Sequence, residues 1–152
     1  MSKLVSEIKT ELGDDWLPEV YEKRVRSGRT RAYDIEIAAR ENRAEIQYTL
    51  LGIELKVGRR RFACPDLATA RYLRVFARIG VREFAIPYDI SQISSIADEL
   101  ETGWQRALLM LEKIGASRTS LVRVMRDEIA TIGPGEPMPS FDRETKQRGS
   151  TD

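Results

Sequence analysis

Histidine is absent from the 152-residue sequence, and cysteine occurs only once, as Cys64. Without an imidazole the chain cannot form a Ser-His or Cys-His nucleophile pair, a histidine metal site or a histidine general base. A single thiol also excludes an internal disulfide and any zinc or iron–sulfur site built from clustered cysteines. Catalysis by this chain would therefore have to use carboxylates, lysine, arginine, tyrosine or a hard metal ion held by carboxylates.

Long apolar runs are absent as well. The longest uninterrupted ones, such as residues 107–111, contain only about five residues, whereas a membrane-spanning helix needs about 20. The N-terminus lacks the apolar core of a signal peptide, because Glu7 and Lys9 interrupt it. These features predict a soluble, cytoplasmic protein without a membrane segment.

The charge of the chain is close to neutral but unevenly distributed. The formal net charge is +1, yet residues 23–80 carry fourteen basic and six acidic side chains, a local net charge of +8. Nearly all of these bases are arginines. A basic segment of this kind indicates a phosphate-binding surface, although charges spread over several solvent-exposed faces would give the same composition.

The apolar spacing predicts one α+β domain over residues 1–132. Period-two alternation indicates neighbouring antiparallel strands, and spacings of three and four residues indicate helices. The expected fold is a mainly antiparallel sheet of three to four strands covered by helices, in the order α-β-β-β-α-β-α-α. After the N-terminal helices, the second of them at 16–26, the predicted elements are strands at 32–39, 45–50 and 53–57, a helix at 67–79, a strand at 84–86, and helices at 92–114 and 119–131.

The alternation also predicts which side chains of the sheet point inward. Residues 41–43 are expected to close a hairpin between the first two strands. Ile46, Tyr48 and Leu50 are then expected to face the core, as are the apolar residues of 53–57. Residues 133–152, by contrast, contain prolines at 134, 137 and 139 and end in polar residues, which predicts a flexible tail.

The candidate chemical site combines Asp34 with Glu54 and Lys56. Glu54 and Lys56 are two residues apart and therefore project from the same face of a strand. If the strands at 32–39 and 53–57 are neighbours, Asp34 lies on that face too. Two carboxylates suit Mg²⁺, which prefers oxygen ligands, and an adjacent ammonium can orient or deprotonate a water that attacks a phosphodiester. The alternative is an ordinary ladder of solvated charges across the sheet.

Together these residues and the element order resemble the PD-(D/E)xK nuclease superfamily over about residues 16–90. That superfamily places an aspartate on one strand and a (D/E)-x-K triplet on the next, which here would be Asp34 and Glu54-Leu55-Lys56, twenty residues apart. The resemblance implies a metal-dependent nuclease with Asp34 and Glu54 as Mg²⁺ ligands and Lys56 as a catalytic residue. It also implies an acid on the first helix, Glu19 or Glu22. The sequence departs from the family pattern in that no proline precedes Asp34.

Arg59, Arg60 and Arg61 follow the lysine of this triplet and are the candidate nucleic-acid-binding residues. Such a cluster contacts backbone phosphates and positions a nucleic acid without reading its sequence. The same cluster also suits an exposed turn or edge strand, where charge discourages pairing with other sheets.

A non-enzymatic function is the alternative to a nuclease. In that interpretation the protein binds a protein partner through the helix at 92–114 and the C-terminal tail, and it can also form a homo-oligomer. The sequence identifies neither the substrate nor the partner.

Overall fold

The computed structural model of the chain describes residues 3–135 and confirms an α+β fold in the predicted order, with one additional strand. The helices are α1 (Lys3–Leu12), α2 (Leu17–Val20), α3 (Leu67–Ile79), α4 (Ile93–Ile114) and α5 (Arg118–Ile132). Short helical turns occur at η1 (Gly13–Asp15), η2 (Tyr21–Val25) and η3 (Ile90–Gln92). The strands are β1 (Thr30–Asp34), β2 (Ala44–Thr49), β3 (Gly52–Val57), β4 (Arg60–Cys64) and β5 (Glu83–Pro87). No helix in the described range is long and apolar enough to cross a bilayer.

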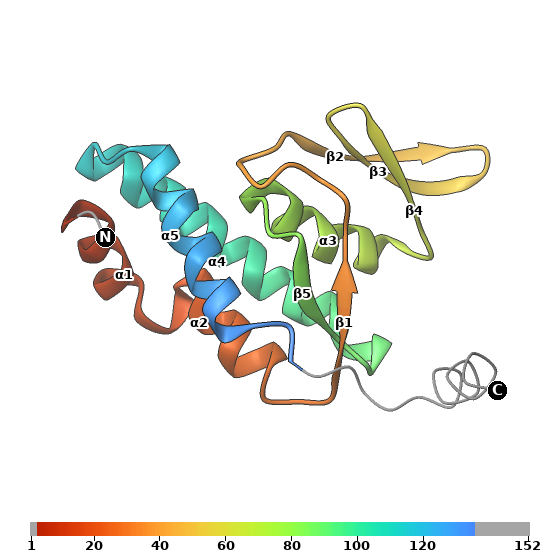
Figure 1. Cartoon of the computed structure of the whole chain (residues 1–152), viewed down its shortest axis with the longest axis horizontal. Helices are drawn as coiled ribbons and strands as arrows, with labels where there is room; N and C mark the ends of the chain where they lie inside the picture. The colour runs from red at the N-terminus through yellow and green to blue at the C-terminus, as the bar shows by residue number, and fades with distance from the viewer. Residues whose placement is uncertain (1–2, 136–152) are drawn as a thin grey trace, which may run out of the picture.

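Helix α4 runs through the middle of the molecule (Figure 1). Its buried side includes Ile96, Leu100 and Trp104 and packs against α3 on one side and α1 and α2 on the other. Helix α3 lies between α4 and the sheet formed by β2, β3 and β4. The apolar stripe of α4 is therefore part of the core of the same chain, and a partner docked on this helix would contact its other face.

The strands form two separate antiparallel sheets, which the sequence did not predict. One sheet has the order β2-β3-β4, and the other consists of β1 paired with β5. The expected hairpin between 32–39 and 45–50 is wrong, because β1 pairs with β5 instead and residues 35–43 form a connection. Phe84, Ala85 and Ile86 of β5 are completely or almost completely buried, and a buried strand needs hydrogen-bond partners for its backbone.

The predicted inner face of the three-stranded sheet is correct near α3 and wrong at the end of the β2–β3 hairpin. Leu55 and Val57 are buried as expected. Tyr48 and Leu50 are instead 72% and 105% exposed. The hairpin extends beyond the body of the molecule (Figure 1), so these side chains have no helix beneath them.

Helix α3 has the predicted limits because its sequence supplies both end signals. The Asp66 side chain accepts a hydrogen bond of 2.7 Å from the Thr69 amide at the start of the helix. At the other end Gly80 adopts a φ of +88°, and a Cβ there would lie 2.2 Å from the Arg40 carbonyl oxygen. Only glycine fits this close approach, which lays the 35–43 connection against the end of α3.

Two buried tyrosines fix the position of β5. The Tyr21 hydroxyl accepts a hydrogen bond of 2.8 Å from the Ala85 amide and donates one of 2.8 Å to the Gly133 carbonyl. The Tyr72 hydroxyl donates a bond of 2.6 Å to the Ala85 carbonyl. Gly133, the first residue of the predicted flexible tail, is thus held by the core. Residues 136–152 of that tail lie outside the described part of the chain.

Replacing Tyr72 by phenylalanine should destabilise the protein by about 1–3 kcal/mol, because the Ala85 carbonyl would be left buried without this partner. Chemical denaturation measures the change in the free energy of unfolding. Tyr48→Phe, at an exposed tyrosine, is the matched control and should change stability by less than about 0.5 kcal/mol. Equal effects of the two substitutions would contradict the assigned role of the Tyr72 hydroxyl.

The same tyrosines should make the protein sensitive to alkaline pH. Burial raises the pKa of Tyr72 well above its ordinary value of 10.0, and burial also raises the pKa of Tyr21. The unfolded chain therefore releases these protons first, so their contribution to stability is complete below about pH 10 and is lost as the pH rises further. Denaturation curves recorded across this range should show a smaller alkaline loss for Tyr72→Phe than for the unmodified protein. An identical pH profile would contradict this prediction.

Candidate nucleic-acid interface

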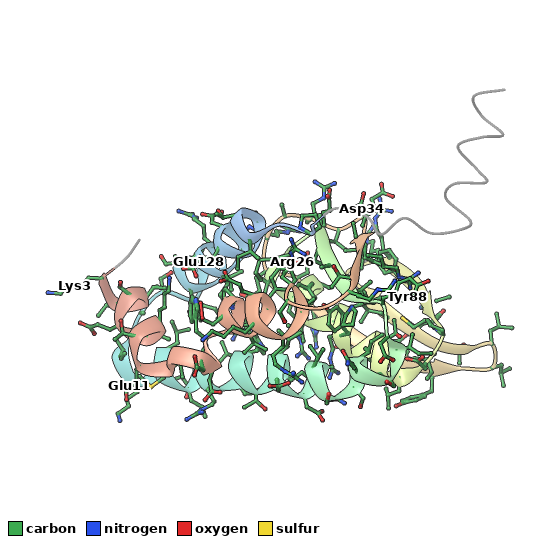
Figure 2. All side chains as sticks on the ribbon, turned by 90° about the horizontal axis from the view of Figure 1, so that it is seen from below. Lys3, Glu11, Arg26, Asp34, Tyr88 and Glu128 are labelled. Carbon is green, nitrogen blue, oxygen red and sulfur yellow. The ribbon has the colours of Figure 1, made fainter. Side chains whose placement is uncertain are left out.

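The structure places the predicted metal ligands in different sheets. Asp34 ends β1, where its cross-strand partner is Glu83 of β5. Glu54 lies in β3 between Gln47 and Ala63. Figure 2 shows Asp34 far from Lys3 and Glu11, in the half of the molecule that carries the strands. The expectation that strand 32–39 is a neighbour of 53–57 is thus wrong. Because this expectation placed Asp34 and Glu54 on one face of a sheet, that placement is wrong too.

Glu54 and Lys56 do share the outer face of β3, but their neighbours there are mostly other charges. Arg61 lies opposite Lys56 and donates to the Glu54 carboxylate over 3.4 Å. Glu45 lies on the other side of Lys56. This is the pattern of a solvated cross-strand ladder. Among residues 3–135 no group of three or more acidic or thiol side chains is arranged to hold a metal ion.

The three consecutive arginines differ in their environments. Arg60 and Arg61 form ion pairs with Glu36 and Glu54, both at 3.4 Å. Arg59 lies in the two-residue turn between β3 and β4, where it is exposed and has no ion-pair partner among the described residues. Two of the three predicted phosphate-binding side chains are therefore already neutralised by neighbours, though only through exposed and weak pairs.

A cleft of about 530 Å³ opens where the end of α3 meets the start of β2. Its walls come from four parts of the chain that are far apart in sequence. The charged residues that line it are Glu41, Arg43, Glu45, Arg78 and Arg118, and the remaining lining residues are Asn42, Ala44, Trp104 and Gln105. Three cations thus face two carboxylates.

A second hollow of about 310 Å³ adjoins this cleft. It is lined by Lys56 and Gly58 together with Arg43 and Glu45, which also line the first. The two hollows form one surface, which we call the basic groove and define by Arg43, Lys56, Arg78 and Arg118. Lys56 was predicted as a catalytic residue and is found in this groove.

The floor of the groove is held in place by Asn42. Its side-chain amide donates to the carbonyls of Ala38, Arg40 and Ala77 at 2.8, 2.9 and 3.0 Å. Its backbone amide donates to the Arg78 carbonyl at 3.0 Å. These bonds attach the 35–43 connection to the last turn of α3, and so they fix the backbone positions of Arg43 and Arg78 in the lining of the groove.

Arg118 closes the far side of the groove. Its side chain donates to Glu41 over 2.5 Å, and its guanidinium lies 5.5 Å from the centre of the Trp104 ring. Trp104 itself is only 3% exposed. The aromatic ring therefore supports the arginine and is too covered to stack on a nucleic-acid base.

Arg78 is the arginine of this groove without a carboxylate of its own, and Lys56 also forms no ion pair among the described residues. Arg78 is partly buried and forms no ion pair among the described residues, whereas Arg43 and Arg118 pair with Glu45 and Glu41. Burial lowers the pKa of the Arg78 guanidinium, and repulsion by the neighbouring Arg74 lowers it further. The nearby carboxylate of Glu101 is already bound by Arg71 and Arg74 at 3.1 and 2.9 Å. A bound anion would reduce the repulsion that Arg74 and Arg118 exert on Arg78.

Comparison with protein-family models, curated proteins and solved structures finds no match for this chain. The comparisons thus provide no test of the resemblance to the PD-(D/E)xK superfamily, and metal-dependent hydrolysis stays a prediction from the sequence.

Sequence reasoning identified the basic segment but did not identify the groove. Arg43 and Arg78 belong to the arginine-rich stretch 23–80, yet no local pattern distinguishes them from the other arginines there. Arg118 lies outside that stretch and enters the groove only through the packing of α5.

Because Asp34 and Glu54 belong to different sheets, millimolar Mg²⁺ should not raise the melting temperature. A ligand held only by the folded state would raise it. The melting temperature should be measured with and without Mg²⁺, both for the unmodified protein and for Asp34→Asn. A rise with Mg²⁺ that disappears in Asp34→Asn would show that Asp34 does bind the metal and would restore the predicted nuclease site.

Proposed function

We propose that the protein binds nucleic acid through the phosphate backbone, in the basic groove. The observation that supports this proposal is Arg78, a partly buried guanidinium that faces a cleft and has no carboxylate partner in the described part of the chain. Arginine is suited to phosphate because its planar fork can donate two hydrogen bonds to one group. Lys56 and Arg59 extend the cationic surface along the β3–β4 hairpin.

The proposed binding is independent of base sequence. Phosphate contacts fix the position of a nucleic acid but do not distinguish its bases. Among the described residues that line the groove, Trp104 is the aromatic one, and it is covered by Arg118 and offers no stacking surface. We therefore expect similar affinity for strands of different sequence and a strong dependence on salt, since each neutralised phosphate releases counterions.

Arg78→Gln should weaken binding of a fluorescent oligonucleotide about tenfold or more at low salt, the contribution of one charge-assisted hydrogen bond. The slope of log affinity against log salt should decrease in magnitude by about one. Fluorescence anisotropy with single-stranded and duplex DNA and RNA gives both quantities. Arg78→Lys, which keeps the charge, should recover part of the affinity.

The matched control is Arg106→Gln, which removes an arginine that pairs with Asp15 on the α1–α4 side of the molecule. It changes the net charge by the same amount and should leave affinity nearly unchanged. Equal losses in the two variants would show that only the overall charge matters. Absence of binding by the unmodified protein at low salt would reject the proposed function.

A further inference from the structure

Large apolar side chains are exposed together at the end of the β2–β3 hairpin. Tyr48 is 72% exposed, and Leu50 and Leu51 are 105% and 100% exposed. The hairpin extends beyond the body of the molecule in both views (Figures 1 and 2). Exposing three large apolar side chains to water does not stabilise the fold. Exposed apolar side chains grouped at one end of a hairpin are typical of an interaction site.

The same hairpin presents an open backbone edge. Strand β2 is at the edge of its sheet, with β3 on one side only. The turn between Thr49 and Gly52 contains two residues, so Thr49, Gln47 and Glu45 hydrogen-bond to β3 in the alternation of an antiparallel pair. The backbone groups of Ile46 and Tyr48 then point away from the sheet, and they form no hydrogen bond with any residue described in the structure.

This edge lacks the features that usually prevent strand pairing. Proteins protect edges with lysine, arginine, proline or a bulge. Strand β2 contains none of these residues, and its only charge is Glu45. The opposite edge of the sheet, β4, begins with Arg60 and Arg61. The two edges differ, and of the two only β2 combines a strand without basic residues with adjacent exposed apolar side chains.

We propose that β2 pairs antiparallel with β2 of a second copy of this chain, about a two-fold axis. An antiparallel strand edge is complementary to itself under this symmetry, because the outward amides of each strand meet the outward carbonyls of the other. The pairing joins two three-stranded sheets into one of six strands and brings the exposed side chains of Tyr48, Leu50 and Leu51 against the partner. The formal net charge of +1 gives little repulsion between copies.

Charge favours a second copy over a phospholipid bilayer or a nucleic acid as the occupant. Residues 44–55 of the hairpin carry Glu45 and Glu54 and no basic side chain. Both acids are paired with arginines, and residues 46–53 carry no charge, so the end of the hairpin offers no cation to an anionic membrane surface or a phosphate backbone. The contact involves one six-residue strand and three large side chains from each copy, which corresponds to a small interface, below about 1,200 Å² in total. The expected dimer is therefore reversible.

Sedimentation equilibrium over a range of protein concentrations tests the proposal. The average mass of the unmodified protein should rise from one chain toward two as concentration increases. Tyr48→Lys places a charge on the edge, and Leu51→Ser removes an apolar contact. Each should raise the dimer dissociation constant tenfold or more. Both residues are exposed, so circular dichroism and the melting temperature should stay unchanged.

Leu109→Ser is the matched control, since Leu109 is 66% exposed on α4, an element with no substantial contact to β2. It should leave the dissociation constant unchanged. A protein that stays monomeric at all concentrations would overturn the proposal, as would a dimer that is insensitive to Tyr48→Lys and Leu51→Ser. Binding of the monomer to phosphatidylcholine vesicles, lost in Leu51→Ser, would assign the hairpin to a membrane and would also overturn it.

Discussion

The arrangement of the fold depends on how the backbone amide and carbonyl groups of one buried strand, β5, find hydrogen-bond partners. Strand β5 has β1 on one side only, and on the other side the hydroxyls of Tyr21 and Tyr72 bind both backbone groups of Ala85. Two side chains thus replace a neighbouring strand. Phe76 and Phe84 stack beside them at 4.2 Å between ring centres. Because side chains already provide hydrogen-bond partners for the free edge of β5, the two-stranded sheet can end inside the core without joining β2, β3 and β4.

The separation of the two sheets also creates the groove. The chain must cross from β1 to β2 over residues 35–43, and Asn42 attaches this connection to the last turn of α3. Ile35 and Ile37 anchor its first part in the core. The polar part that follows is left at the surface opposite α5, where Arg43, Arg78 and Arg118 come together. The groove is a consequence of packing the connection on a helix end.

Eight of the seventeen arginines in residues 3–135 form ion pairs with carboxylates. Arg71 and Arg74 share Glu101, and Arg24 binds Glu99, which joins α4 to its neighbours. A high arginine content therefore does not by itself define a binding surface. Arg78 is distinguished by its position in the wall of a cleft without a carboxylate partner. The edge strand β2 is distinguished by the opposite feature, because it carries no basic side chain.

The sequence by itself determined the α+β class, the helices and the limits of α3, because apolar spacing and end residues such as Asp66 and Gly80 act locally. It also determined that Leu55 and Val57 face inward. The pairing of β1 with β5 was decided only by tertiary structure, since Tyr21 and Tyr72 are remote from Ala85 in sequence. The same holds for the candidate site. Lys56 reaches the groove, but Asp34 lies in the other sheet, because strand alternation specifies the face of a residue and not the neighbour of its strand.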